Sequence, residues 1–220
     1  MSSSDRVAEV VGPRNPRAAT IWDRIALVPW WRKVFHVFFG LYSITVVLSV
    51  ERPWPLYQAV AWLIVWFLIE FWRQSDRRFN RLFFRTFRLF VRRQERRRPV
   101  GNTWFAAAAV FVTACVRDPT LAAACFVGWT FGDPTAEVFG RTIMSPRVGI
   151  GRKTLAGLAA CFTVSLATYL LFFLLIKGGV WWKLSLVGAA ATTLAEIWSD
   201  RIDDNLTIPV ACALAFLLFS

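Results

Sequence analysis

The most restrictive feature of this chain is a run of 22 consecutive residues without a charged side chain, Leu155–Ile176. A helix of that length crosses the roughly 30 Å hydrocarbon core of a bilayer. Hydrophobic residues make up 56% of the 220 residues, with 12 Trp and 20 Phe. This composition is typical of a membrane protein rather than of a large soluble core, so we expect an integral membrane protein.

Several other apolar segments are candidate spans. Two of them, Thr103–Val116 and Leu206–Ser220, are near 14 residues and are short for a bilayer. We expect an all-α fold: a polytopic membrane helix bundle of about seven transmembrane helices. The candidate spans are Val34–Val50, Pro53–Trp72, Thr103–Val116, Thr120–Phe139, Leu155–Ile176, Val180–Trp198 and Leu206–Ser220.

The loops differ in their content of Lys and Arg, which accumulate on the cytoplasmic side of membrane proteins. With the N-terminus in the cytoplasm, the opposite side keeps only Arg52, Arg117, Lys177 and Lys183. The sequence therefore predicts a multi-pass protein with a cytoplasmic N-terminus and an extracytoplasmic C-terminus. Its polar motifs would face the cytoplasm. The protein itself would lie in a bacterial plasma membrane or in a eukaryotic endomembrane.

The predicted organisation is a tail followed by one domain. Residues 1–31 form a polar, partly disordered N-terminal tail that ends in an interfacial segment, Ile21–Trp31. Residues 32–220 form a single integral-membrane domain. The net charge is +12, and the arginine clusters that contribute to it lie directly beside apolar spans. This position favours anionic membrane lipids over nucleic acid as partners.

Residues 73–98 form a strongly basic segment. Its phenylalanines and arginines recur at spacings of three and four, which predicts two stripes on one amphipathic helix in the membrane interface. One interpretation is a membrane-surface anchor. The other is that some of these arginines, together with Glu95, close over a nucleotide.

Carboxylates occur where apolar segments end, and ionised groups are costly there unless they serve a function. Asp133 and Glu137 are four residues apart and would share a helix face. Glu196, Asp200 and Asp203 or Asp204 repeat the pattern near another span, with spacings of four and of three or four. These two sets of carboxylates are the ligand type that Mg²⁺ takes together with substrate phosphates. The alternative is that the acids only neutralise arginines at helix ends.

A basic glycine-containing loop, Gly151-Arg152-Lys153-Thr154, precedes the longest span. It does not have the spacing of a Walker A loop. It still combines cations with the start of a helix at Thr154, where free N–H groups and the helix dipole favour phosphate. The lone histidine, His36, and four scattered cysteines do not indicate a zinc site or structural disulfides.

Taken in order, these motifs resemble the polyprenol kinase family, which includes dolichol kinase, phytol kinase and the CTP-dependent diacylglycerol kinase. The resemblance extends from about Arg32 to the end of the chain. It rests on Arg32-Lys33-x-x-His36, Glu70, Glu95, Gly132-Asp133-x-x-Ala136-x-x-x-Gly140-Arg141, Gly151-x-Lys153-Thr154-x-x-Gly157 and Glu196…Asp203-Asp204-Asn205-Leu206-Thr207-Ile208-Pro209.

The resemblance implies phosphorylation of the hydroxyl of a lipid alcohol, such as phytol, dolichol, a polyprenol or diacylglycerol, with CTP as the donor and Mg²⁺ as the metal. Asp133, Lys153 and Asp204 would be catalytic. Nucleotide-binding residues would be Gly132, Gly140, Arg141, Gly151, Arg152, Lys153, Thr154 and Asn205; metal ligands would be Asp133, Glu137, Glu196, Asp203 and Asp204; further candidates are Arg32, Lys33, His36, Glu70 and Glu95.

Two other functions are compatible with the pattern. Phosphatidate cytidylyltransferase also binds CTP in a polytopic bundle, and its signature resembles Arg141 and Lys153-Thr154-x-x-Gly157. Its usual C-terminal Pro-Gly-His-Gly-Gly run is absent from this chain, which favours the kinase. A non-catalytic protein that binds anionic lipids would explain the arginines, but not the carboxylates.

Overall fold

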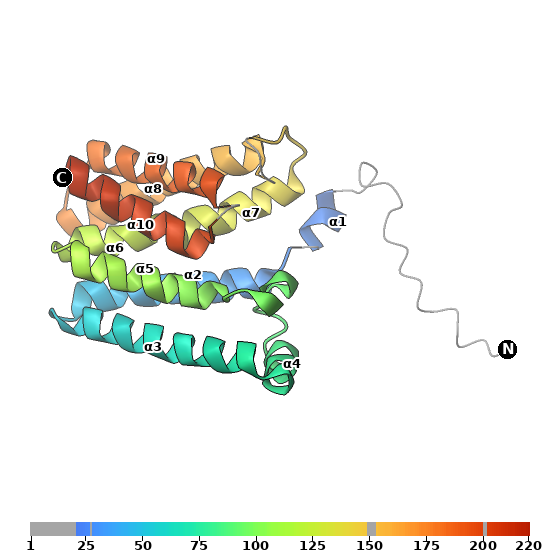
Figure 1. Cartoon of the computed structure of the whole chain (residues 1–220). Coiled ribbons are helices and arrows are strands. Elements are labelled where there is room, and N and C mark those ends of the chain that lie inside the picture. The colour runs from blue at the N-terminus through green and yellow to red at the C-terminus, as the bar shows by residue number, and fades with distance from the viewer. Residues whose placement is uncertain (1–20, 27, 149–152, 200–201) are drawn as a thin grey trace.

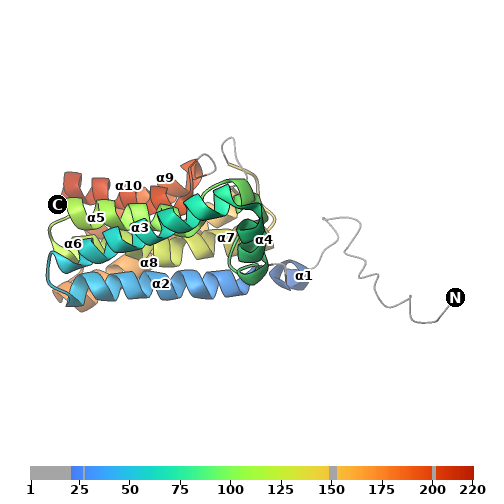
Figure 2. The ribbon, with the colours of Figure 1, turned by 60° about the horizontal axis from the view of Figure 1, so that its bottom comes forward.

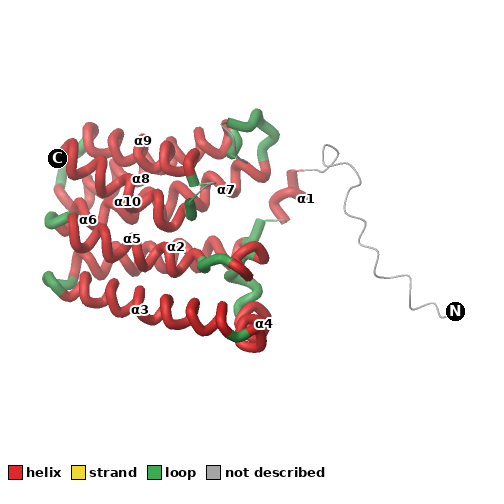
Figure 3. Tube along the Cα trace, viewed as in Figure 1, coloured by secondary structure: helices red, strands yellow, loops and turns green. Residues whose placement is uncertain are grey.

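The computed structural model describes residues 21–26, 28–148, 153–199 and 202–220. Apart from one β-bridge between Arg147 and Thr154, these residues form helices and the loops that join them (Figure 3). The elements are α1 (Ile21–Ala26), α2 (Trp30–Ser49), α3 (Trp54–Ser75), α4 (Arg77–Thr86), the 3₁₀ turn η1 (Arg93–Arg97), α5 (Gly101–Cys115), α6 (Pro119–Val127), the π-helical turn η2 (Gly128–Gly132), α7 (Asp133–Thr142), α8 (Leu155–Lys177), α9 (Trp182–Trp198) and α10 (Asp204–Phe219).

The long helices lie side by side and run alternately in opposite directions (Figures 1 and 2). Helices α1 and α4 lie at one end of the bundle, and the C-terminus lies at the other. The order of the helices agrees with the predicted spans. The all-helical prediction is confirmed.

Among the described residues, three helices are long and apolar enough to cross a bilayer: α2, α3 and α8. Helices α5 and α10 are shorter but also apolar. Much of the outer surface consists of exposed large side chains, including Phe67 and Phe71 on α3 and Leu175 on α8. Exposed apolar surface of this extent requires a lipid environment. The chain is therefore a multi-pass integral membrane protein.

The core is formed mainly by small residues of α6 packed against α5, α8 and α10. Ala123, Ala124 and Cys125 have no exposed surface, and they lie in the same cluster as Phe173 and Ile208. Small residues let membrane helices approach closely, which gains dispersion energy where no hydrophobic effect drives association. Helix α2 packs against α6, whereas α3 packs against α5. The consecutive helices α2 and α3 are not closely packed against each other, which leaves space between them.

The fourth predicted span, Thr120–Phe139, is not a regular α-helix. It consists of α6, the π-helical turn η2 and α7 in direct succession. A π-helical turn inserts an extra residue and leaves backbone groups of the helix without their usual partners. The hydroxyl of Thr130 donates to the carbonyl of Phe126 at 2.6 Å within this turn. Sequence periodicity does not signal such an insertion.

The prediction of one long amphipathic helix over residues 73–98 is wrong. Helix α4 ends at Thr86, and a separate 3₁₀ turn follows at Arg93–Arg97. Within α4 the predicted stripes are present, because Phe83 is buried while Arg81 and Arg85 are exposed. The segment bends back because its later backbone carbonyls bind a buried arginine of α3, described below.

At the end of the bundle opposite α4, Asp118 caps α6. Its carboxylate accepts from the N–H groups of Thr120 at 2.7 Å and Leu121 at 3.0 Å, and Lys177 lies 3.4 Å away. Partial burial acts to raise the pKa of Asp118, but the Leu121 N–H and Lys177 outweigh it, so the pKa lies below its ordinary value.

We expect Asp118→Ala to lower the free energy of unfolding by about 1 kcal/mol, because a helix loses its N-cap, and Asp118→Asn to retain most of the stability. Because the folded-state pKa is depressed, the ionic part of this stabilisation is present above the ordinary Asp pKa of about 4 and is lost as the pH falls below it. Thermal unfolding in detergent between pH 3 and pH 8 measures both effects. Equal stability of the Ala and Asn variants would contradict the capping role.

Candidate functional site

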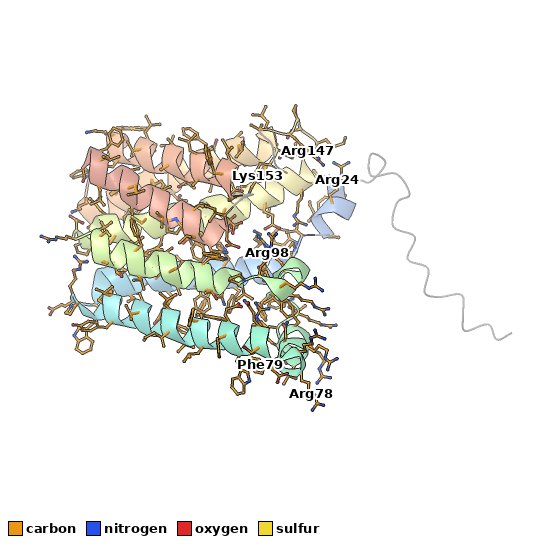
Figure 4. All side chains as sticks on the ribbon, viewed as in Figure 1. Arg24, Arg78, Phe79, Arg98, Arg147 and Lys153 are labelled. Atoms are coloured by element: carbon orange, nitrogen blue, oxygen red, sulfur yellow. The ribbon has the colours of Figure 1, made fainter. Side chains whose placement is uncertain are left out.

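Charged residues of the described chain gather at the end of the bundle where α1 and α4 lie. Figure 4 shows Arg24, Arg78, Arg98, Arg147 and Lys153 at this end. Helices α2 and α10 begin here, and α3, α7 and α9 end here (Figures 1 and 2). The fold therefore brings together motifs that are far apart in the sequence.

The start of α2 forms ion pairs with α7. Lys33 is 5% exposed and contacts the carboxylate of Glu137, and its Nζ lies 3.9 Å from Oδ2 of Asp133. Arg32 donates to the same oxygen of that carboxylate, at 2.9 Å from Oε2 of Glu137. Arg141 lies 2.7 Å from the second oxygen of that carboxylate. Asp133 and Glu137 were predicted to share a helix face. Both lie next to Lys33, which agrees with that prediction.

His36 lies deeper along the same face of α2. Its Nε2 is 2.8 Å from the carbonyl oxygen of Trp129 and 3.6 Å from Oδ2 of Asp133. Its ring stacks on the indole of Trp129 with a centroid distance of 3.8 Å. The imidazole therefore joins the π-helical turn η2 to α2 next to the Asp133 carboxylate.

Helix α10 begins at the site with Asp203, Asp204 and Asn205. The Asp203 carboxylate caps the helix by accepting from the N–H of Asn205 at 3.1 Å. Burial, followed by the charge of Asp204, raises the pKa of Asp203 to about 7. Asp204 is buried and pairs with the guanidinium of Arg92 at 3.2 Å.

Asn205 links α10 to η2. Its Oδ1 accepts from the indole N–H of Trp129 at 3.0 Å, and its Nδ2 donates to the carboxylates of Asp203 and Asp204. The side chain is therefore held on both sides. As a result, Asn205 orients the two carboxylates that precede it rather than projecting freely from the helix.

Lys153 and Glu196 form a third pair, with 2.5 Å between Nζ and Oε1. Burial alone would lower the pKa of Lys153, but the Glu196 carboxylate and the charge of Asp133 raise it above its ordinary value. Lys153 is therefore a cation at neutral pH. The other oxygen of Glu196, Oε2, is buried without a hydrogen-bond partner among the described residues.

Within the described residues, no three His, Cys, Asp or Glu side chains converge as a complete metal cage. The donor set nevertheless fits a hard cation that is shared with phosphate. Mg²⁺ usually takes only one or two carboxylates and fills its other positions with water and substrate oxygens. The partnerless Oε2 of Glu196 and the buried carboxylates of Asp133 and Asp204 are oxygen donors of this type.

A groove of about 430 Å³ leads from these carboxylates into the bundle. Side chains from one face each of α2, α3 and α5 form its walls, including Phe39, Trp62, Trp66 and Phe105. Asp133, Asp204, Asn205, His36 and Arg92 line the same groove. The groove therefore combines a charged region with a long apolar region. It lies where α2 and α3 are not closely packed against each other.

The predicted glycine and loop residues lie on the other side of the charged cluster. Gly140, Arg141 and Thr154 line a second, open depression of about 460 Å³. The hydroxyl of Thr154 accepts from the N–H of Gly157 and so caps α8. A Cβ on Gly132 would lie 2.3 Å from Oγ of Ser165, so Gly132 permits close packing against α8. Gly151 and Arg152 lie outside the described residues, as does Asp200.

Glu70 and Glu95 belong to a network beside the charged cluster, and Glu95 also lines the groove. Arg73 has no exposed surface and pairs with Glu70 at 2.5 Å. Its guanidinium also donates to the backbone carbonyls of Glu95, Arg96 and Arg98. The carboxylate of Glu95 accepts from the N–H of Arg92. This network folds the basic segment back over the bundle and carries Arg92 to Asp204.

Comparison with known proteins gives one informative relative. The chain is 30% identical to CTP-dependent diacylglycerol kinase 1 of Saccharomyces cerevisiae over 210 residues, which cover 83% of this chain and 70% of the relative. The chain belongs to the polyprenol kinase family. No protein-family model and no solved structure matches it.

Two residues that line the groove of this polyprenol kinase family member are not among the candidates predicted from the sequence: Arg92 and Trp129. Arg92 was one of many arginines in a regular stripe, and nothing in the spacing distinguishes it from its exposed neighbours. Trp129 precedes Asp133 by four residues, so it would share a face with Asp133 in a regular helix. That spacing is the one sequence feature that could have identified Trp129 as a neighbour of the site.

The Arg73 network yields a stability prediction. We expect Arg73→Met to lower the free energy of unfolding by about 3–5 kcal/mol, because it leaves Glu70 as a buried charge without its partner. Arg77→Met, which removes an exposed arginine of α4, should change it by less than about 0.5 kcal/mol. Thermal unfolding in detergent compares the two variants. Similar unfolding temperatures for both would contradict the role assigned to Arg73.

Proposed function

We propose that this chain is a CTP-dependent kinase that phosphorylates the hydroxyl group of a membrane lipid alcohol, a diacylglycerol or an isoprenoid alcohol. Its relative is named a CTP-dependent diacylglycerol kinase, so diacylglycerol is the first alcohol to test. The observation that carries the proposal is the groove, whose apolar walls lead directly to buried carboxylates.

The groove is suited to a molecule with a hydrocarbon tail and a polar head. Its aromatic and aliphatic lining offers dispersion contacts to a tail, while Asp133, Asp204 and Asn205 face the head. The space between α2 and α3 gives a route from the bilayer. A lipid alcohol in this position has its hydroxyl at the level of the carboxylates.

The cations at the site are suited to the donor nucleotide. Lys33, Arg92 and Lys153 all surround the carboxylates, and each is now paired with one of them. Phosphate oxygens can replace these carboxylates as partners, since guanidinium and ammonium groups bind both. Arg141 and Thr154, which line the open depression, are candidates for contacts with the rest of the nucleotide.

Mg²⁺ would be held by Glu196, through its free Oε2, and by Asp204. When bound, it neutralises charge on the phosphates of the donor. Asp203, which caps α10 beside Asp204, and Glu137, which is already held by three cations, would act indirectly. Both were predicted as metal ligands; we now propose that they orient the ligands and cations around them.

Phosphoryl transfer depends mainly on alignment and on charge stabilisation. The lipid hydroxyl oxygen forms a bond to the γ-phosphorus of CTP, the bond to the β-phosphate oxygen breaks, and CDP leaves. We assign Asp133 to accept the hydroxyl proton, because it lines the groove and its basic neighbours are not in close contact: Nζ of Lys33 and Nε2 of His36 lie 3.9 Å and 3.6 Å from its Oδ2. Lys33, Arg92 and Lys153 stabilise the charge on the transferred group.

The site end of the bundle would face the cytoplasm. We propose seven spans, with α6, η2 and α7 as one of them, a cytoplasmic N-terminus and a single membrane domain from residue 32 onward. Arg81, Arg85 and Arg88 are exposed at this end and would contact anionic headgroups. A cytoplasmic site has access to CTP and Mg²⁺.

Phosphate transfer from γ-labelled CTP to phytol, a polyprenol or diacylglycerol in Mg²⁺-containing mixed micelles tests the proposal, with ATP in parallel. We expect a labelled lipid phosphate. No labelled product, with CDP-lipid formed from phosphatidate and α-labelled CTP, would instead identify a cytidylyltransferase. No product in either assay would contradict both enzymes and leave a lipid-binding role.

The assignment of Asp133 gives a specific prediction. We expect Asp133→Asn to lower kcat by about 10²–10⁴-fold, because an amide cannot accept the hydroxyl proton. Asp118→Asn, which changes a carboxylate at the far end of the bundle, should leave kcat unchanged. Initial rates at saturating substrates measure the difference. A fully active Asp133→Asn variant would rule out this role.

The groove gives another prediction. Ala109 lines it from α5, so Ala109→Phe should fill part of it and raise KM for the lipid by about tenfold or more, while KM for CTP stays unchanged. Ala107→Phe, on the same helix but outside the groove lining, is the matched control. Equal effects of both variants, or an effect on CTP alone, would show that the tail does not bind here.

A further inference from the structure

The π-helical turn η2 lies directly before Asp133 and is held by a tyrosine from another helix. The N–H of Gly128, at the start of the turn, donates to the hydroxyl of Tyr169 on α8 at 3.2 Å. Tyr169 has no exposed surface. Its hydroxyl is therefore a buried partner for a backbone group at the point where the regular α-helix gives way to the π turn.

The Tyr169 hydroxyl also has buried partners on α9 and α10. The hydroxyl of Thr192 donates to the carbonyl of Gly188 at 2.9 Å and lies 3.3 Å from the Tyr169 hydroxyl. A threonine has one hydroxyl hydrogen, so Thr192 can only accept from Tyr169, and Sγ of Cys212, also 3.3 Å from the tyrosine hydroxyl, is a second acceptor. One chain of hydrogen bonds therefore runs from the Gly128 N–H through Tyr169 and Thr192 to Gly188. Such a chain strengthens each of its bonds in a low-dielectric interior.

The packing around the chain is tight at two glycines. A Cβ on Gly128 would lie 2.0 Å from Oγ1 of Thr192 and 2.6 Å from the hydroxyl of Tyr169. A Cβ on Gly188 would lie 2.8 Å from the ring of Tyr169. The tyrosine of α8 therefore lies between glycines of η2 and α9, and its hydroxyl occupies the space that a larger residue at position 128 would fill.

The register of η2 decides where two site residues point. Trp129, inside the turn, contacts His36 and Asn205, and Asp133 is the first residue after the turn. Each residue of a regular α-helix turns by about 100°, so a helix without the inserted residue would rotate Asp133 by about that angle relative to Phe126. Asp133 would then turn away from the groove.

We propose that Tyr169 is a positioning residue: its hydroxyl holds η2 in the π-helical register that directs Asp133 and Trp129 into the groove. It touches neither substrate nor nucleotide and acts through the backbone of Gly128. The inference rests on the proposed kinase function for its effect on turnover, whereas its effect on the helix is independent of that function.

Tyr169→Phe removes only the hydroxyl and tests the inference in the full-length protein. We expect faster deuterium uptake in the peptide that covers residues 126–133, with unchanged protection of the rest of α8 and α9. In the diacylglycerol assay, kcat per folded protein should fall at least tenfold, while KM for CTP and for the lipid changes less than threefold. A general loss of folding would instead raise exchange throughout the bundle.

Ser185→Ala is the matched control, because Ser185 is also a fully buried hydroxyl but has no hydrogen-bond partner in the described part of the chain and lies near the start of α9. It should change neither exchange nor kcat. If Tyr169→Phe does not fold, Thr192→Val interrupts the next link and should have the same effects, and Thr192→Ser should restore activity.

The results separate the two proposals. Unchanged exchange in residues 126–133, or faster exchange with full kcat, would overturn the role of Tyr169 while leaving the kinase intact. An unmodified protein that phosphorylates no alcohol would overturn the kinase, and the exchange measurement would still decide whether Tyr169 holds the turn.

Discussion

Burying a carboxylate at the end of an apolar bundle is costly unless a cation pairs with it, and this constraint organises the structure. Glu137 is held by Lys33, Glu196 by Lys153 and Asp204 by Arg92. Each pair joins segments that are distant in sequence: α2 to α7, the loop before α8 to α9, and the basic segment to α10. The ion pairs that offset the cost of burying the carboxylates therefore also hold the segments of the site together.

The same pairs explain how an apolar groove can end at charge. If the acids lacked partners, they would be protonated or displaced toward water, and the groove would have no polar end. With partners, they remain fixed beside Phe39, Trp66 and Phe105. A substrate with a tail and a hydroxyl group matches this juxtaposition, and phosphates can replace the carboxylates as partners of the cations.

The sequence predicted the helical fold and the order of the helices, because uncharged runs and loop charges report directly on membrane insertion. It also selected Asp133 and Asp204, since carboxylates at the ends of apolar segments are unusual, and Lys33 through the resemblance to the polyprenol kinase family. It did not predict η2, whose register depends on a hydroxyl from α8, or the bend after α4, which depends on Arg73. Both arise from contacts between helices, which a linear pattern does not contain.

The most direct test is an experimental structure of the protein with Mg²⁺, a non-hydrolysable CTP analogue and a lipid alcohol. The account predicts the tail in the groove between α2, α3 and α5, the hydroxyl beside Asp133, and the terminal phosphate against Lys33, Arg92 and Lys153. A lipid on the outer surface of the bundle, or phosphates on the opposite side of α7 from the groove, would contradict it.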